Sequence, residues 1–310
     1  MTDIAAPAAG AQQRRLAHLG MLAFAALIAG SFTFGAAAVP YLAPVPLNAL
    51  RFVMAGLLMG AFAFGVARSR FEWPRAPWRF GVTGFLTAVY FVSMFIALTM
   101  TLPVATSAVY TLVPIMTALT GFLIVGQRSG PPVLLSLLLA GVGAVWVIFR
   151  GDLDALLRFD VGPSEVIYLV GCVAYSIYTP LLRRYNRGES ALVLSFWTLT
   201  GTAVCIVLYG LPEILATDWL HLPPVVWWVV AYLAVGPTAI CFFLIQFASV
   251  HLPATKVIAY GYVVPAFVIV FEGLVGHGWA SLSVAAGAAM TVLGLAVLAA
   301  LPEKSGRATS

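Results

Sequence analysis

Two tyrosine–proline pairs recur inside long apolar stretches of the chain. Tyr110 precedes Pro114, and Tyr260 precedes Pro265, by about one helical turn. Each proline lies about 15 Å into its stretch, close to the midplane of a bilayer. Because proline lacks an amide, the carbonyl one turn earlier loses its helical partner, and in lipid that carbonyl must face protein or a wet cavity. Phenols and freed carbonyls at this depth could hold an ammonium group, unless the prolines only kink helices for packing.

Polar and aromatic residues also form stripes at helical spacing. One stripe is Thr83, Thr87, Tyr90 and Met94, and the other is Tyr168, Cys172, Tyr175 and Thr179. Stripes of this kind suit a cavity for flat or amphipathic solutes, although helix packing explains them too. Gln246 carries a carboxamide that needs partners inside a membrane. The predicted binding residues are Tyr90, Met94, Tyr110, Tyr175, Thr179, Gln246 and Tyr260.

Charged residues are rare within the apolar stretches. Glu272 costs roughly 2 to 4 kcal/mol there unless it is paired or protonated, so it is a candidate proton carrier or a structural ion-pair partner. Arg51 can extend to the interface or pair with a neighbour, and Lys256 lies near the end of its stretch. Coupling and structural roles stay open for Glu272 and Arg51.

Catalytic and cofactor motifs are not found in the sequence. It contains no GxxxxGK[ST], GxSxG, HExxH or CxxC pattern, and its four histidines are expected near the ends of spans. The three cysteines fall within apolar stretches, where they act as small apolar residues. We therefore expect no metal site, no cofactor and no enzymatic activity.

Ten membrane spans must position these residues. Hydrophobic residues make up 62% of the 310 positions and charged residues 9%, against about 25% charged residues in soluble domains. At about 20 residues per span, the expected helices are 19–39, 47–67, 79–100, 104–126, 131–149, 163–182, 191–211, 223–247, 254–276 and 281–301. The fold class is therefore an all-α polytopic membrane protein. Gly56 and Gly60 form a GxxxG pattern, and Gly141, Gly143, Gly287 and Gly294 predict close packing of spans five and ten.

An internal repeat divides the chain into two halves. The segment LPVATSAVYTLVP at 102–114 recurs as LPATKVIAYGYVVP at 252–265. With five spans in each half, the second half enters the membrane from the opposite side, so the repeat is inverted. Such repeats are typical of transporters with a site near the midplane at the repeat interface. We expect tails at 1–18 and 302–310, a connecting loop at 151–162, and repeats at 19–150 and 163–301, with the first dozen residues disordered.

The distribution of charge predicts the orientation. Basic residues collect on the side of the two termini: Arg14, Arg15, Arg68, Arg70, Arg75, Arg79, Arg128, Arg183, Arg184, Arg187, Lys256, Lys304 and Arg307. The opposite loops carry Asp152, Asp154, Asp160, Glu213 and Asp218, with Glu165 at a span entrance and only Arg150 and Arg158 as cations. By the positive-inside rule, both termini are cytoplasmic. The net charge of +5 thus sets orientation, and no nucleic-acid partner is expected.

The chain resembles the drug/metabolite transporter superfamily, specifically its ten-span branch with paired EamA-type domains. The resemblance covers essentially the whole chain and rests on LNALRF in span two, on the LP-x(10,11)-P pattern of spans four and nine, and on the glycines of spans five and ten. Members typically end spans four and nine with Gly-Glu, where this chain has Gly126-Gln127 and Gly276-His277. Among members it looks most like bacterial exporters of amino acids, plausibly aromatic ones.

The expected function is therefore secondary transport of small organic solutes by alternating access, with export of aromatic or other apolar amino acids foremost. Export of other metabolites or drugs, and passive facilitation, are the alternatives. The expected partners are the small-molecule substrate and the lipid bilayer. The oligomeric state stays open, with one copy sufficient for transport, and the expected location is the bacterial inner membrane.

Overall fold

A computed structural model describes residues 5–71, 73–74, 76–126, 130–157, 161–252 and 254–300. All regular structure in these ranges is helical. In chain order the elements are α1 (Ala5–Ala36), α2 (Pro44–Gly60), η1 (Ala61–Val66), α3 (Trp78–Leu98), α4 (Pro103–Tyr110), α5 (Val113–Val125), α6 (Pro131–Ile148), α7 (Leu153–Leu157), α8 (Pro163–Tyr185), α9 (Ala191–Ala216), η2 (Trp219–His221), α10 (Pro224–Leu233), η3 (Ala234–Ile240), α11 (Cys241–His251), α12 (Ala254–Ala259), η4 (Tyr260–Val263), α13 (Val264–Val275) and α14 (Leu282–Ala300).

Nine of the described helices, some of them made of consecutive elements, are long and apolar enough to cross a membrane, and Leu282–Val297 is a shorter tenth. Each lies on one of the ten predicted spans, so the all-α polytopic fold is confirmed. Proline supplies the first residue of α2, α4, α6, α8 and α10. A first-turn amide has no helical partner in any case, so proline starts these helices without loss.

The predicted disordered tail is wrong for the part of it that the structure describes. Helix α1 begins at Ala5 and continues without interruption into the first span. Alanine has the highest helix propensity of all residues, and Pro7 falls in the first turn, where proline is tolerated. From Ala5 onward, the tail is therefore an extension of α1.

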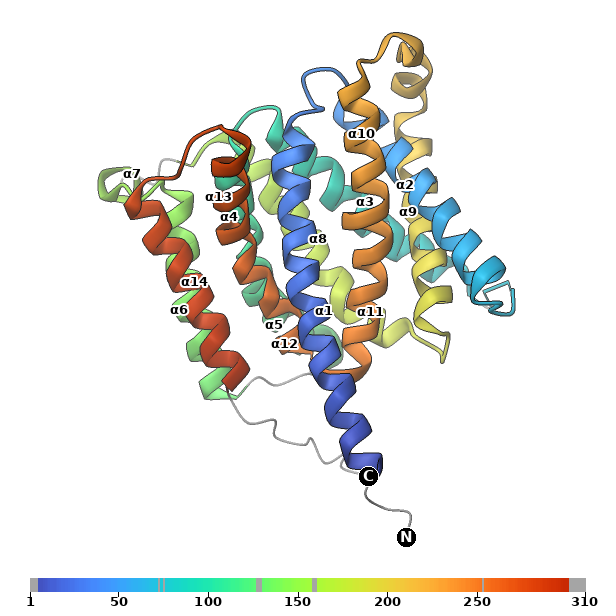
Figure 1. Cartoon of the computed structure of the whole chain (residues 1–310), viewed down its shortest axis with the longest axis horizontal. Coiled ribbons are helices and arrows are strands. Elements are labelled where there is room, and N and C mark those ends of the chain that lie inside the picture. The colour runs from blue at the N-terminus through green and yellow to red at the C-terminus, as the bar shows by residue number, and fades with distance from the viewer. Residues whose placement is uncertain are drawn as a thin grey trace.

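The helices form one bundle whose two ends carry different charges. Helix α1 begins and α14 ends at one end, called here the terminal end, while α7 lies at the other, the α7 end (Figure 1). The cations Arg14, Arg15, Arg68, Arg70, Arg79, Arg184, Arg187 and Lys256 fall at the terminal end together with the anion Glu189, and the anions Asp152, Asp154, Glu165, Glu213 and Asp218 fall at the α7 end together with the cation Arg150. Arg75, Arg128, Arg158, Asp160, Lys304 and Arg307 lie outside the described residues.

Contacts between the two halves of the chain build much of the bundle. Helix α6 packs on α14, α2 on α9, α3 on α8 and α9, and α1 on α11 and α13. Figure 1 shows α6 and α14 side by side along one flank. A Cβ on Gly143 would lie 2.6 Å from the carbonyl oxygen of Gly287, so the predicted close packing of these two helices is present.

The crossing of α3 and α9 is equally close. A Cβ on Gly84 would lie 2.4 Å from the carbonyl carbon of Gly201, and next to this crossing Thr87 and Thr202 share a 2.6 Å hydrogen bond between their hydroxyls. By contrast, a Cβ on Gly56 meets nothing within 4 Å and one on Gly60 meets only the Phe196 ring. Within the described part of this single chain, the GxxxG pattern is therefore not a seam where two backbones touch.

Candidate functional site

A cluster of tyrosines from α3, α4 and α8 lies in the middle of the bundle. The rings of Tyr90 and Tyr175 stack with their centroids 4.5 Å apart, and Tyr110 lies 6.1 Å from Tyr90 and 6.4 Å from Tyr175. Tyr168 donates its hydroxyl to that of Tyr90 at 2.9 Å. These four side chains are buried. The structure thus brings together three of the predicted binding tyrosines and Tyr168 of the same stripe.

Further residues complete the cluster. Met94, a predicted site residue, is buried one turn after Tyr90. Tyr178, which sequence reasoning missed, lies 5.4 Å from Tyr175, and its buried hydroxyl has no hydrogen-bond partner. The signal was available, because position 178 follows Tyr175 by three residues on the same helical face. Thr179 is buried, but its hydroxyl donates to the Tyr175 carbonyl, so it is already satisfied within α8.

Two predicted site residues lie apart from these ring contacts. The Tyr260 hydroxyl is 2.6 Å from Nδ1 of His18 in α1. The residue next to it, Gly261, is the one that meets the cluster, since a Cβ there would lie 3.1 Å from the Tyr110 ring. Gln246 is buried in α11 and its amide nitrogen has no partner. An unsatisfied buried amide is costly, which makes Gln246 available for a ligand.

Helix breaks precede both midspan prolines. The first span of this pair stops at Tyr110 and restarts at Val113, and the second passes through the 3-10 turn η4 before Val264. Carbonyls beside the breaks are already used: Thr111 donates its hydroxyl to Ala108, and Thr291 of α14 donates to Tyr262. The first of these bonds is local to its span, whereas the second joins α14 to η4.

A third break occurs in span eight, where the sequence analysis did not place one. Pro237 lies inside the π-helical segment η3, and Thr238 donates its hydroxyl to the Leu233 carbonyl at 2.6 Å. Since Pro237 has no amide to offer that carbonyl, the threonine hydroxyl replaces it. The adjacent Gly236-Pro237 pair was the sequence signal for this break.

Arg51 does not extend to the membrane interface. It is completely buried, because α2 starts at Pro44 and so places Arg51 about two turns into the span. Its Nε donates to the Thr238 hydroxyl at 2.6 Å, while Nη1 and Nη2 have no hydrogen-bond partner. Asn48, one turn earlier and also missed, is buried with an unpartnered Oδ1.

A cleft of about 950 Å³ opens at the α7 end of the bundle. Glu272, His277 and Arg150 contribute its ionisable side chains. Nδ1 of His277 lies 3.0 Å from Oε2 of Glu272, whereas Oε1 of Glu272 has no partner. The Gly276-His277 pair thus supplies an ionisable neighbour for Glu272. Its counterpart Gln127 lies outside the described residues.

The lining of the cleft lies about one to two helical turns above the tyrosine cluster. The cleft is lined by Ala36 of α1 and Leu98 of α3, and four residues deeper on these helices come Phe32 and Met94, about 6 Å further in. The Phe32 ring lies 6.2 Å from Tyr110. The apolar side chains of Phe32 and Met94 therefore lie between the lining of the cleft and the tyrosines along α1 and α3.

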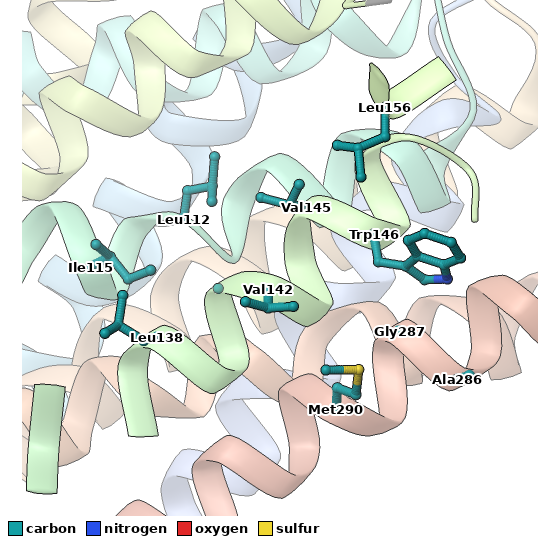
Figure 2. A pocket seen from close by; sticks show the side chains of 11 residues that line it. Leu112, Ile115, Leu138, Val142, Val145, Trp146, Leu156, Ala286, Gly287 and Met290 are labelled. Atoms are coloured by element: carbon teal, nitrogen blue, oxygen red, sulfur yellow. The ribbon is translucent and has the colours of Figure 1, made fainter. Parts of the chain in front are cut away.

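Another groove, of about 430 Å³, lies on α6 and α14 beside the break between α4 and α5. Figure 2 shows Leu112, Ile115, Val142 and Met290 lining it. Its one polar side-chain group, the Trp146 indole N–H, already donates to Ser283. This groove cannot hold a charged solute and is not the candidate site.

The comparisons with known proteins decide the family. The model of the EamA-like transporter family matches residues 15–149 and again residues 163–300. The chain belongs to the EamA-like transporter family. This confirms the resemblance to the drug/metabolite transporter superfamily and the two-repeat architecture, and it makes the chain a multi-pass membrane protein of a transporter family.

One curated protein and one solved structure are similar to this EamA-like protein. The uncharacterized transporter YyaM of Bacillus subtilis (strain 168) is 23% identical over 224 residues, which cover 70% of this chain and 72% of YyaM. A solved crystal structure with 22% identity superposes with a TM-score of 0.70 over 91% of this chain and 98% of that chain. The second likeness shows the fold alone.

Proposed function

We propose that this EamA-like protein exports amino acids with aromatic or other apolar side chains. The observation that carries the proposal is the buried tyrosine cluster, which lies mid-bundle beneath a largely apolar cleft that also presents Glu272, His277 and Arg150. Stacked rings such as Tyr90 and Tyr175 form a flat surface that a planar or apolar side chain can replace or join. The unpartnered amide of Gln246 and hydroxyl of Tyr178 are available for polar ends of the solute. Other metabolites or drugs of similar shape are the alternative cargo.

Alternating access between the two halves is the proposed mechanism. The contact of α3 with α8 has its counterpart in the contact of α11 with α1. The contact of α2 with α9 is its own counterpart, and so is the contact of α6 with α14. Under an offset of five spans, each of these contacts maps onto another or onto itself, which is what an inverted repeat requires. At the terminal end the hydrogen bond between His18 and Tyr260 holds α1 against η4. Opening there and closing of the cleft would carry the solute across.

We place the α7 end outside a bacterial inner membrane and the terminal end in the cytoplasm, since most of the described cations gather at the terminal end and Arg150 is the one at the α7 end. In a variant with Cys172, Cys205 and Cys241 replaced, a cysteine at Asp154 should react with an impermeant maleimide added outside. A cysteine at Ser69 should react only after the membrane is opened. Labelling of both from outside would contradict the orientation.

Transport into liposomes by the purified protein tests the function. A panel of labelled amino acids, with and without a pH gradient, should give saturable uptake and counterflow of aromatic and apolar members. Counterflow distinguishes a carrier from a passive channel, which shows neither saturation nor counterflow.

Variants of the cluster test the position of the site. Tyr110→Ala and Gln246→Ala should weaken the apparent affinity about threefold to a hundredfold, because each removes one contact to the solute. Tyr209→Ala is the matched control, since Tyr209 is 75% exposed on α9 and faces outward. If both site variants insert normally and transport with the affinity of Tyr209→Ala, the site lies elsewhere.

A further inference from the structure

The guanidinium group of Arg51 is held inside the membrane span with most of its donors unused. The residue is completely buried, and both terminal nitrogens, Nη1 and Nη2, have no hydrogen-bond partner. A buried cation without a compensating partner is strongly unfavourable, so such residues mark sites where a ligand or an ion arrives.

The side chain is fixed in place by groups that leave those two nitrogens free. Its Nε donates to the hydroxyl of Thr238, which the proline break in η3 positions. The guanidinium lies 4.5 Å from the centre of the Phe91 ring and 5.5 and 5.7 Å from those of Phe52 and Phe95. Aromatic faces attract a cation but accept no conventional hydrogen bond, so the donor fork of Arg51 is preorganised for an acceptor from outside the chain.

This fork lies next to the tyrosine cluster. The guanidinium packs against the ring of Phe91. Phe91 also lines a small cavity together with Tyr175, Tyr178 and Cys241. The cavity measures about 10 Å³, which is too small for a solute, so in this structure the site is closed around its own side chains.

The neighbouring residue Asn48 offers the complementary group. It lies three residues before Arg51, on the same face of α2, and its amide nitrogen donates to the carbonyls of Pro44 and Phe91. Its Oδ1 is buried without a donor. Arg51 supplies unused donors and Asn48 an unused acceptor, one turn apart.

We propose that Arg51 binds the carboxylate of the transported solute through Nη1 and Nη2, with Asn48 accepting from the α-ammonium beside it. The inference rests on the proposed export of amino acids and adds that the cargo must carry a carboxylate. Guanidinium and carboxylate match in a two-pronged geometry, and the pairing neutralises the buried charge. The aromatic side chain of the cargo then extends toward Tyr90 and Tyr175.

Thermal melting of the purified protein with three ligands that share a phenyl ring tests the carboxylate site directly. The ligands are L-phenylalanine, 3-phenylpropionate, which keeps only the carboxylate, and phenethylamine, which keeps only the amine. The two acids should raise the Tm of the wild-type protein. In the Arg51→Met variant, the affinity for the two acids should fall about tenfold to a hundredfold. The Tm shift caused by phenethylamine should be the same as in the wild-type protein. Arg51→Lys should give an intermediate loss, because lysine keeps the charge without the fork.

Arg79→Met is the matched control, because Arg79 is the other largely buried arginine among the described residues but is paired with Glu189 at the terminal end. It should melt earlier because its ion pair is lost, yet keep the response to both acids. Arg51→Met without ligand should melt no earlier than the wild-type protein, because an uncompensated buried charge is replaced by an apolar side chain.

The inference is overturned if neither acid shifts the Tm of the wild-type protein, or if the shift persists unchanged in Arg51→Met. Uptake of amino acids by an Arg51→Met variant at wild-type affinity would also overturn it, while leaving the proposed export intact. Conversely, an Arg51-dependent response to 3-phenylpropionate in a protein that moves no amino acid would support the carboxylate site and refute amino-acid export.

Discussion

Gly84→Ala should destabilise the protein by about 1–3 kcal/mol, the usual cost of overpacking a tight core. The new Cβ would lie 2.4 Å from the carbonyl carbon and 2.7 Å from the oxygen of Gly201, and 2.6 Å from the amide of Thr202. These are backbone atoms of α9, which cannot rotate away as a side chain can. The helices would have to separate, and the hydroxyl bond between Thr87 and Thr202 would stretch from 2.6 Å.

Gly56→Ala is the matched control for this prediction. The same substitution in α2 places its Cβ where nothing lies within 4 Å. It should be neutral or should stabilise the helix by roughly 0.5–1 kcal/mol, because alanine loses less backbone entropy than glycine. Melting of both purified variants in one detergent gives the comparison. Equal melting temperatures would show that the crossing of α3 and α9 is not a tight seam.

The positions of the helices could be predicted from the sequence because the bilayer imposes a length and an apolar composition on each span. The same argument located the breaks at Tyr110 and Tyr260, since proline acts through its own missing amide. Sequence reasoning did not predict the close crossing of α3 and α9 at Gly84 and Gly201. Which glycine faces a neighbouring backbone depends on how the helices rotate against each other, and the GxxxG spacing of Gly56 and Gly60 carries no such information.

The site could be predicted only in part, for the same reason. Tyr90 and Tyr175 each belong to a stripe of residues at helical spacing, and the structure turns both stripes toward the interior of the bundle, where they meet Tyr110. Tyr260 matches Tyr110 in the repeat but faces His18. The two copies have diverged in what surrounds them, so repeat symmetry predicts where a residue lies along its span but not what it touches.

The carboxyl of Glu272 is buried at the edge of the cleft at the α7 end. It lines the cleft at the α7 end, which we assign to the outer face, and its Oε1 has no partner there. His277 holds the other oxygen at 3.0 Å, and Arg150 lies in the same cleft. We propose that Glu272 carries the coupling proton, because a carboxyl inside a membrane span is typical of a proton relay.

Glu272→Gln should abolish accumulation driven by a pH gradient, because glutamine keeps the size and hydrogen bonding of the side chain but cannot carry a proton. Exchange of substrate for substrate needs no net proton movement and should continue at close to the wild-type rate. Glu213→Gln, on the exposed end of α9 away from the cleft, is the control and should accumulate normally. Liposome assays with and without an imposed gradient measure both activities. If Glu272→Gln instead melts earlier and still accumulates substrate with the gradient, Glu272 serves the fold through His277 and the coupling proton is carried by another group.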